Sequence, residues 1–101
     1  MTALDRSDLE ARWLTITRYA LPALAAERQW PVSADHCFQR ILLDAAVGGR
    51  WYDAIVGRPA YRHADDDVLQ RAVQLGQAAI AGKADLTALN RRSLGWRRAL
   101  R

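Results

Sequence analysis

A helix is predicted most clearly by the stretch SADHCFQRILLDAAVGG, residues 33–49. Ser33 supplies a start signal, and Gly48 and Gly49 supply a stop after Val47, because glycine readily adopts the left-handed conformation that ends helices. Between these signals the apolar residues recur at helical spacing and so share one face: Cys37, Phe38, Ile41, Leu42 and Ala45. The stretch therefore predicts an amphipathic helix that contributes one face to a core.

The same spacing predicts three more helices on either side of this one. The first runs from Ser7 to about Leu21, where Pro22 either kinks it or starts a second piece. Another follows the acidic residues 65–67 and runs to about Ala81, and the last spans 85–99. No segment alternates with a period of two, and no Asn-Gly or Asp-Gly hairpin turn occurs. The predicted fold class is all-α, a compact bundle of four to five helices forming a single domain, residues 1–101.

Length and composition limit the size of the core and the cellular compartment that we expect for this protein. With 101 residues, half of them apolar, the chain can bury one modest core. Its apolar runs are far shorter than the roughly 20 residues that cross a bilayer, and its acidic start does not resemble a secretory signal. Cys37 is the single cysteine, so no internal disulfide forms. We expect a protein of a bacterial-type cytoplasm with no membrane partner.

The net charge of +4 comes entirely from the end of the chain. Residues 1–84 carry nine Arg and one Lys against ten acids, whereas residues 85–101 carry five Arg against one acid. The five are Arg91, Arg92, Arg97, Arg98 and Arg101. Such a set can neutralise several phosphates and give salt-sensitive binding that is mostly independent of base sequence. The alternatives are a solvated helix face and an arginine excess that is only compositional.

The most unusual stretch is GGRWYDAIVGRPAYRHA, residues 48–64, which reads as a loop with one helical turn at 52–56. It combines cations and rings: Arg50, Trp51, Tyr52, Arg58, Tyr61, Arg62 and His63. Guanidinium groups bind phosphates and carboxylates bidentately, and aromatic faces stack on bases or other planar ligands. In the competing structural interpretation, Trp51 and Tyr61 close the core while the arginine stems pack along them.

A second candidate site lies on the predicted helix 33–47. His36, Arg40 and Asp44 follow one another at i, i+4 and i+8 along its more polar edge, with Arg40 and Asp44 spaced as a surface ion pair. If the loop folds back over this edge, Asp53 and His63 would complete a polar pocket. The weak catalytic candidates are then His36, Asp44 and His63. Cys37 is no partner for His36, because neighbours on a helix point about 100° apart.

Metal and cofactor sites have little support. Two histidines and one cysteine without HxxxH or CxxC spacing make a zinc site improbable. No glycine-rich phosphate loop opens a helix. The sequence predicts no metal and no cofactor.

Three segments carry a resemblance to a family: DHCFQRILLDAAVGGRWYD (35–53), PAYRH (from Pro59) and LNRRSLGWRR (89–98). They resemble a family of small, uncharacterised bacterial all-helical proteins, over roughly residues 9–98. Members are sometimes labelled GNAT-type acetyltransferases. That fold requires a central sheet and a pyrophosphate loop of the form Q/R-x-x-G-x-G/A, and this sequence has neither. The resemblance therefore implies no activity, and it directs attention to residues 35–63.

Three functions remain open. The leading one is a non-enzymatic helical module that binds an anionic partner, with nucleic acid as the best guess. Its proposed contacts are Arg50, Trp51, Tyr52, Arg58, Arg62, His63, Arg91, Arg92 and Arg98. The second is a small enzyme or small-molecule binder with a pocket between helix 33–47 and the loop 48–64. The third is an adaptor for another protein, or a homodimer, because four tryptophans are generous for so small a core.

Overall fold

The computed structural model describes residues 5–98, and every regular element within that range is a helix. The helical elements in order are α1 (Arg6–Thr15), the π-helix η1 (Ile16–Ala20), α2 (Leu21–Ala25), α3 (Asp35–Val47), α4 (Trp51–Ala54), α5 (Ala60–His63), α6 (Asp66–Ile80) and α7 (Leu86–Arg98). The all-α class is confirmed. Within the described range, no helix has the length and apolar character needed to cross a membrane.

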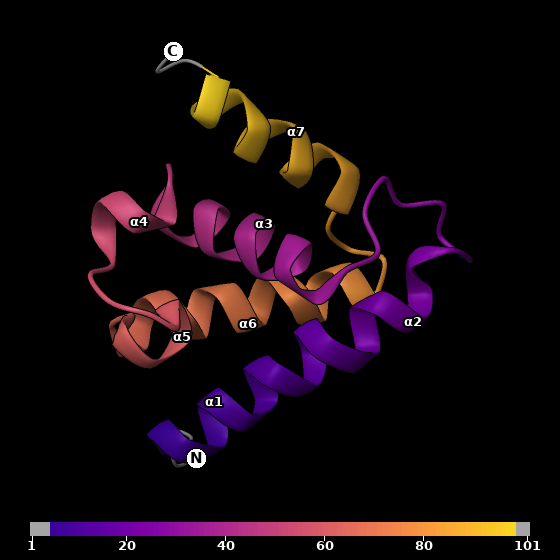
Figure 1. Cartoon of the computed structure of the whole chain (residues 1–101). Helices are drawn as coiled ribbons and strands as arrows, with labels where there is room; N and C mark the ends of the chain where they lie inside the picture. Colours follow the sequence, from indigo (N-terminus) through magenta and orange to yellow (C-terminus); the bar gives the residue numbers. More distant parts are fainter. Residues whose placement is uncertain (1–4, 99–101) are drawn as a thin grey trace.

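The central element is α3, which lies between α6 on one side and α7 on the other (Figure 1). The run from α1 to α2 packs on the far side of α6 and also reaches α3 through η1. Because α3 has neighbours on several sides, it buries residues well beyond its predicted apolar face. Phe38, Ile41 and Leu42 are buried as predicted, and Leu43 and Asp44 are buried as well.

The first helix passes through Pro22 without a break. The backbone N–H of Leu21 donates to the carbonyl of Ile16, five residues earlier, which is the hydrogen bond of a π turn. Proline has no N–H and its ring crowds the preceding turn. The wider turn just before Pro22 relieves that conflict, and the helix continues to Ala25. Helical structure therefore continues past Leu21, as both alternatives at Pro22 had implied.

Two predicted helix starts are wrong and one is confirmed. The side chain of Asp5, not Ser7, caps α1 by accepting from the backbone N–H of Asp8 at 2.9 Å. Ser33 does not cap α3, which begins at Asp35 without a side-chain cap bond. Asp85, where the last helix was predicted to start, caps α7 by accepting from the backbone N–H of Ala88 through Oδ1 at 3.1 Å. The predicted stop at Gly48 is confirmed, because that residue has a φ of 75°.

The inner face of α7 differs from the predicted one. The spacing of apolar residues in the last helix predicts an inner stripe of Leu86, Leu89, Ser93, Trp96 and Leu100, of which Leu100 lies outside the described residues. Leu86 and Ser93 are buried as predicted, whereas Leu89 and Trp96 are only half-buried. Asn90, which was not predicted to face inward, is buried beside Ser93, so the centre of the inner face is polar. A glycine within a helix suggests close packing, and the sequence predicts such a role for Gly95. This prediction is wrong, because a Cβ there would meet nothing within 4 Å.

Candidate functional site

The centre of the polar network between α3, α4 and α7 is the carboxylate of Asp44, which is fully buried. It accepts hydrogen bonds from the Ser93 hydroxyl at 2.6 Å and from the backbone N–H of Trp51 at 2.9 Å. Arg97 donates to both carboxylate oxygens, through Nε at 3.0 Å and Nη2 at 3.1 Å. Asp44 thus binds three elements together. It does not lie on a polar surface edge, as the sequence had suggested.

Arg40 belongs to the same network but makes no ion pair with Asp44. Its Nη1 donates to the Ser93 hydroxyl oxygen at 2.7 Å, and its Nη2 donates to the side-chain oxygen of Asn90 at 2.9 Å. The predicted surface pair of Arg40 and Asp44 is therefore wrong. The network contains two guanidiniums, those of Arg40 and Arg97, and one carboxylate, which pairs with Arg97 alone, so it retains one positive charge.

Three guanidinium groups lie over the two aromatic rings of α4, those of Trp51 and Tyr52. The Arg50 and Arg97 guanidiniums each lie 5.2 Å from the centre of the Tyr52 ring. The Arg58 guanidinium lies 5.6 Å from the ring of Trp51, which meets Tyr52 edge-on at 5.5 Å. We call these five residues the arginine–aromatic surface. It joins the loop 48–64 to the end of α7, two regions that the sequence had suggested as separate candidates.

One of these arginines is also paired with a carboxylate. Nε of Arg50 lies 2.8 Å from Asp53, and this hydrogen bond raises the pKa of the Arg50 guanidinium above its ordinary value. The bond uses the Nε–H donor of Arg50 within the fold. For Arg50, therefore, the structure agrees in part with the alternative in which the loop arginines serve the fold. Arg58 has no carboxylate partner among residues 5–98.

Arg62 and His63 have different surroundings. Arg62 stacks on Tyr61 at 5.9 Å and lines a depression shared with Glu10 and the acidic residues 65–67. The His63 ring packs on Gly57, where an added Cβ would come within 2.7 Å of it. The structure thus places Arg62 beside acids and gives His63 a packing role.

The outer side of α7 is strongly basic. Arg91, Arg92 and Arg98 are exposed and have no ion-pair partner within residues 5–98, and Arg92 stacks on Trp96 at 5.4 Å. Acidic residues gather instead at the starts of α1 and α6, at the opposite edge of the molecule from α7 (Figure 1). The chain therefore has a basic side and an acidic side.

A hollow of about 210 Å³ lies between α3 and the loop after α4, where a polar pocket was predicted. We call it the α3 hollow; its lining residues are His36, Gln39, Arg40, Leu43, Trp51, Arg58, Pro59 and Ala60. His36 stands at it with its side chain 80% exposed. Asp44 is fully buried, and neither Asp44 nor His63 lines the hollow, so the structure does not assemble the predicted trio of His36, Asp44 and His63.

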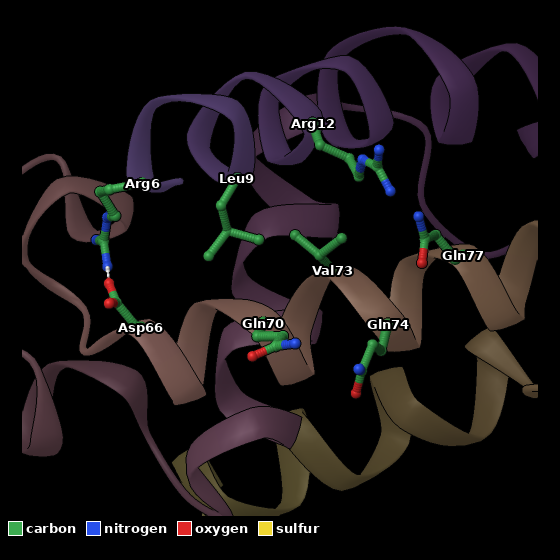
Figure 2. Close-up of a pocket in the computed structure, with 8 residues that line it drawn as sticks. All are labelled: Arg6, Leu9, Arg12, Asp66, Gln70, Val73, Gln74 and Gln77. Atoms are coloured by element: carbon green, nitrogen blue, oxygen red, sulfur yellow. Dashed lines mark hydrogen bonds and ion pairs between the residues drawn. The ribbon is translucent and has the colours of Figure 1, made fainter. Parts of the chain in front are cut away.

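A groove of about 260 Å³ runs between α1 and α6, a feature that no sequence pattern predicted. Figure 2 shows Leu9 and Val73 facing each other across its floor, with glutamine side chains of α6 along one wall. Arg6 and Asp66 close one end at 2.7 Å, so the guanidinium there is already paired. The part of the chain that the structure describes contains no group of three His, Cys, Asp or Glu residues placed to hold a metal ion.

Comparison with known protein families, curated proteins and solved structures finds no match for this chain.

Sequence reasoning missed two of the residues that attach α7 to α3, Asn90 and Arg97. Leu86, Asn90, Ser93 and Arg97 follow one another at intervals of four, three and four, which places them on one helix face. A search for apolar residues passes over this face because three of the four are polar. The signal that could have found this face is the pair of Arg40 and Asp44, one turn apart on α3. Their donors and acceptors match those of the polar residues on α7.

Proposed function

We propose that this protein is a non-enzymatic module that binds nucleic acid through the outer side of α7 and the adjoining arginine–aromatic surface. The observation that carries the proposal is the set of exposed arginines on α7 with no ion-pair partner in the described residues: Arg91, Arg92 and Arg98. Arginine suits this role because its planar guanidinium binds phosphate oxygens bidentately and stacks on planar groups.

The distribution of charge supports the same partner. The acids gathered at the starts of α1 and α6 repel phosphates, while α7 carries four arginines and no acid between residues 86 and 98. A polyanion would therefore be steered toward one side of the molecule. Phosphate contacts of this kind supply affinity with little base specificity.

The attachment of α7 also supports a binding role. Arg97, on the same helix, donates to Asp44 and lies over Tyr52, so the end of α7 is held against α3 and α4. The exposed arginines Arg91, Arg92 and Arg98 are then presented from a fixed helix. A fixed array loses less conformational entropy on binding than arginines on an unattached segment would.

The test is fluorescence anisotropy of labelled single-stranded DNA, duplex DNA and RNA from about 50 to 200 mM salt. With three phosphates neutralised, the logarithm of the affinity for duplex DNA should fall with a slope of about −2.7, or about 40-fold over this range. The Arg91→Gln/Arg92→Gln variant removes two contacts, so its slope should be shallower by about 1.8.

The matched control is Arg12→Gln/Arg18→Gln, which removes the same charge from exposed positions on α1 and η1. It should retain the wild-type slope, because local phosphate contacts rather than net charge determine it. Equal losses in the two double variants would show a general charge effect and refute the assigned surface. An absence of binding at 50 mM salt to all three nucleic acids would refute the function.

A further inference from the structure

The α3 hollow contains a half-buried guanidinium that has no carboxylate of its own. Other part-buried arginines are ion-paired: Arg97 with Asp44 at 3.0 Å, and Arg6 with Glu10 at 2.8 Å. Arg40 instead donates only to the neutral oxygens of Ser93 and Asn90. A cation withdrawn from water is unfavourable without an opposite charge, so this position favours the arrival of an anion.

The orientation of Arg40 is set before any ligand binds. The Ser93 hydroxyl that accepts from Arg40 itself donates to Asp44, and Arg97 holds Asp44 from the other side. Two of the five guanidinium N–H donors of Arg40 account for its two bonds, which leaves donors for a ligand. A donor fixed in this way binds without first losing side-chain entropy.

A second guanidinium comes from the loop side of the hollow. Arg58 is held on the ring of Trp51 at 5.6 Å, and both residues line the hollow with Arg40. No acidic residue is part of the lining. Asp35 does not line the hollow, but its carboxylate lies 3.7 Å from Nδ1 of His36, which does. The hollow thus has two arginines from separate elements and a ring beside them.

We infer that the α3 hollow binds a single phosphate group. Two guanidiniums match a phosphomonoester, which carries a charge of about −1.5 to −2 at neutral pH, better than a singly charged carboxylate. The volume of about 210 Å³ falls below the roughly 300–1,000 Å³ of sites that enclose a drug-sized ligand. The hollow therefore takes the phosphate group while the remainder of its carrier stays outside, beside Trp51.

This site adjoins the proposed nucleic-acid surface and shares Arg58 and Trp51 with it. Its other guanidinium, that of Arg40, lies outside that surface, and the site does not use the exposed arginines of α7. The phosphate group could come from a small phosphate ester or from the phosphorylated end of a nucleic-acid strand. These sources share one binding chemistry, and separate arms of the experiment distinguish them.

The experiment follows the four tryptophan indole N–H signals by NMR, with the Trp51 signal assigned from a Trp51→Phe variant. Inorganic phosphate is titrated at constant ionic strength, with sodium acetate as the singly charged comparison. We expect a saturable shift of the Trp51 signal with phosphate, at least tenfold weaker binding of acetate, and no shift of the buried Trp13 signal. A linear, unsaturated change, or equal affinity for acetate, would overturn the proposal.

The deciding variants are Arg58→Gln and Arg62→Gln. Both arginines stack on a ring in the same segment, but only Arg58 lines the hollow. Arg58→Gln should weaken phosphate binding at least tenfold, and Arg62→Gln should leave the Kd within twofold. Equal effects of the two substitutions would overturn the site. Arg58 makes no hydrogen bond or ion pair within residues 5–98, so its loss should not unfold the chain.

Two further comparisons identify the carrier of the phosphate group and distinguish the phosphate site from the proposed nucleic-acid surface on α7. Adenosine monophosphate and a 5′-phosphorylated oligonucleotide are compared with adenosine and the 5′-hydroxyl oligonucleotide, and the phosphorylated member that shifts Trp51 identifies the carrier. Arg91→Gln/Arg92→Gln should retain phosphate binding in full. Loss of the phosphate shift in that variant would overturn the assignment of phosphate to the hollow, whereas loss of polymer binding alone concerns only the α7 surface.

Discussion

Replacing Asp44 with asparagine tests whether the buried carboxylate holds α7 against α3. The two side chains have nearly the same size, so the substitution changes charge and hydrogen bonding with little change in packing. Each carboxylate oxygen accepts two hydrogen bonds, Oδ1 from Trp51 and Arg97, and Oδ2 from Ser93 and Arg97. Whichever way the new amide is turned, its NH2 group faces two groups that now donate to Asp44.

The expected loss follows from that geometry. Removing one partner of a buried ion pair costs about 3–5 kcal/mol. The Arg97 side chain is 27% exposed and recovers some solvation, so we expect the lower end, about 3 kcal/mol. A small domain has a total unfolding free energy of about 5–15 kcal/mol. The Tm should therefore fall by about 12–24 °C, at about 4–8 °C for each kcal/mol.

Urea unfolding followed by far-UV circular dichroism measures this loss, with Asp53→Asn as the matched control. Asp53 also pairs with an arginine, Arg50 at 2.8 Å, but its side chain is 54% exposed. The control should cost less than about 1 kcal/mol, because exposed ion pairs contribute little. If Asp44→Asn cost no more than Asp53→Asn, the buried network would not be what stabilises the docking of α7.

Two glycines of the helices should respond in opposite directions. Gly76→Ala places a Cβ 2.8 Å from Cγ2 of Ile16 and 3.2 Å from Cδ1 of Leu42, so the overpacked contact should lower the unfolding free energy by about 1–3 kcal/mol. Urea unfolding checks it, and a stability equal to wild type would contradict the close approach of α6 to η1 and α3. Gly95→Ala adds a methyl group in open space on α7 and should raise the unfolding free energy by up to about 1 kcal/mol. A thermal melt with an unchanged or lower Tm would contradict the open environment of Gly95.

Much of the helical core was accessible from the sequence because hydrophobic periodicity is a local property. Leu9, Trp13 and Ile16 on the first helix, and Leu69 and Val73 on α6, recur at helical spacing, which predicts one apolar face for each helix. All five are buried. The helix ends were less accessible. Asp5 rather than Ser7 caps α1, because both residue types can accept from a free backbone N–H and only the path of the chain selects between them.

The candidate site was predicted in part. The loop arginines and rings were identified, but their connection to α7 depends on Arg97 reaching Tyr52, across residues far apart in the chain. The predicted pocket beside α3 exists with His36 and Arg40 in its lining, and without Asp44 or His63. Which side chains share a pocket depends on how the loop packs, and spacing along one helix does not contain that information.

The sequence by itself determined the all-α class, the positions of the main helices and the apolar faces of α1, α3 and α6, because each follows from residues within one or two turns of one another. Only the tertiary structure decided which face of α7 is buried and that the carboxylate of Asp44 is buried with it. A polar helix face is compatible with solvent or with a partner that offers matching donors and acceptors. Arg40 and Asp44 on α3 are that partner for Asn90, Ser93 and Arg97. A carboxylate that reads as a surface group is therefore buried, because groups about 50 residues away in the chain replace its water.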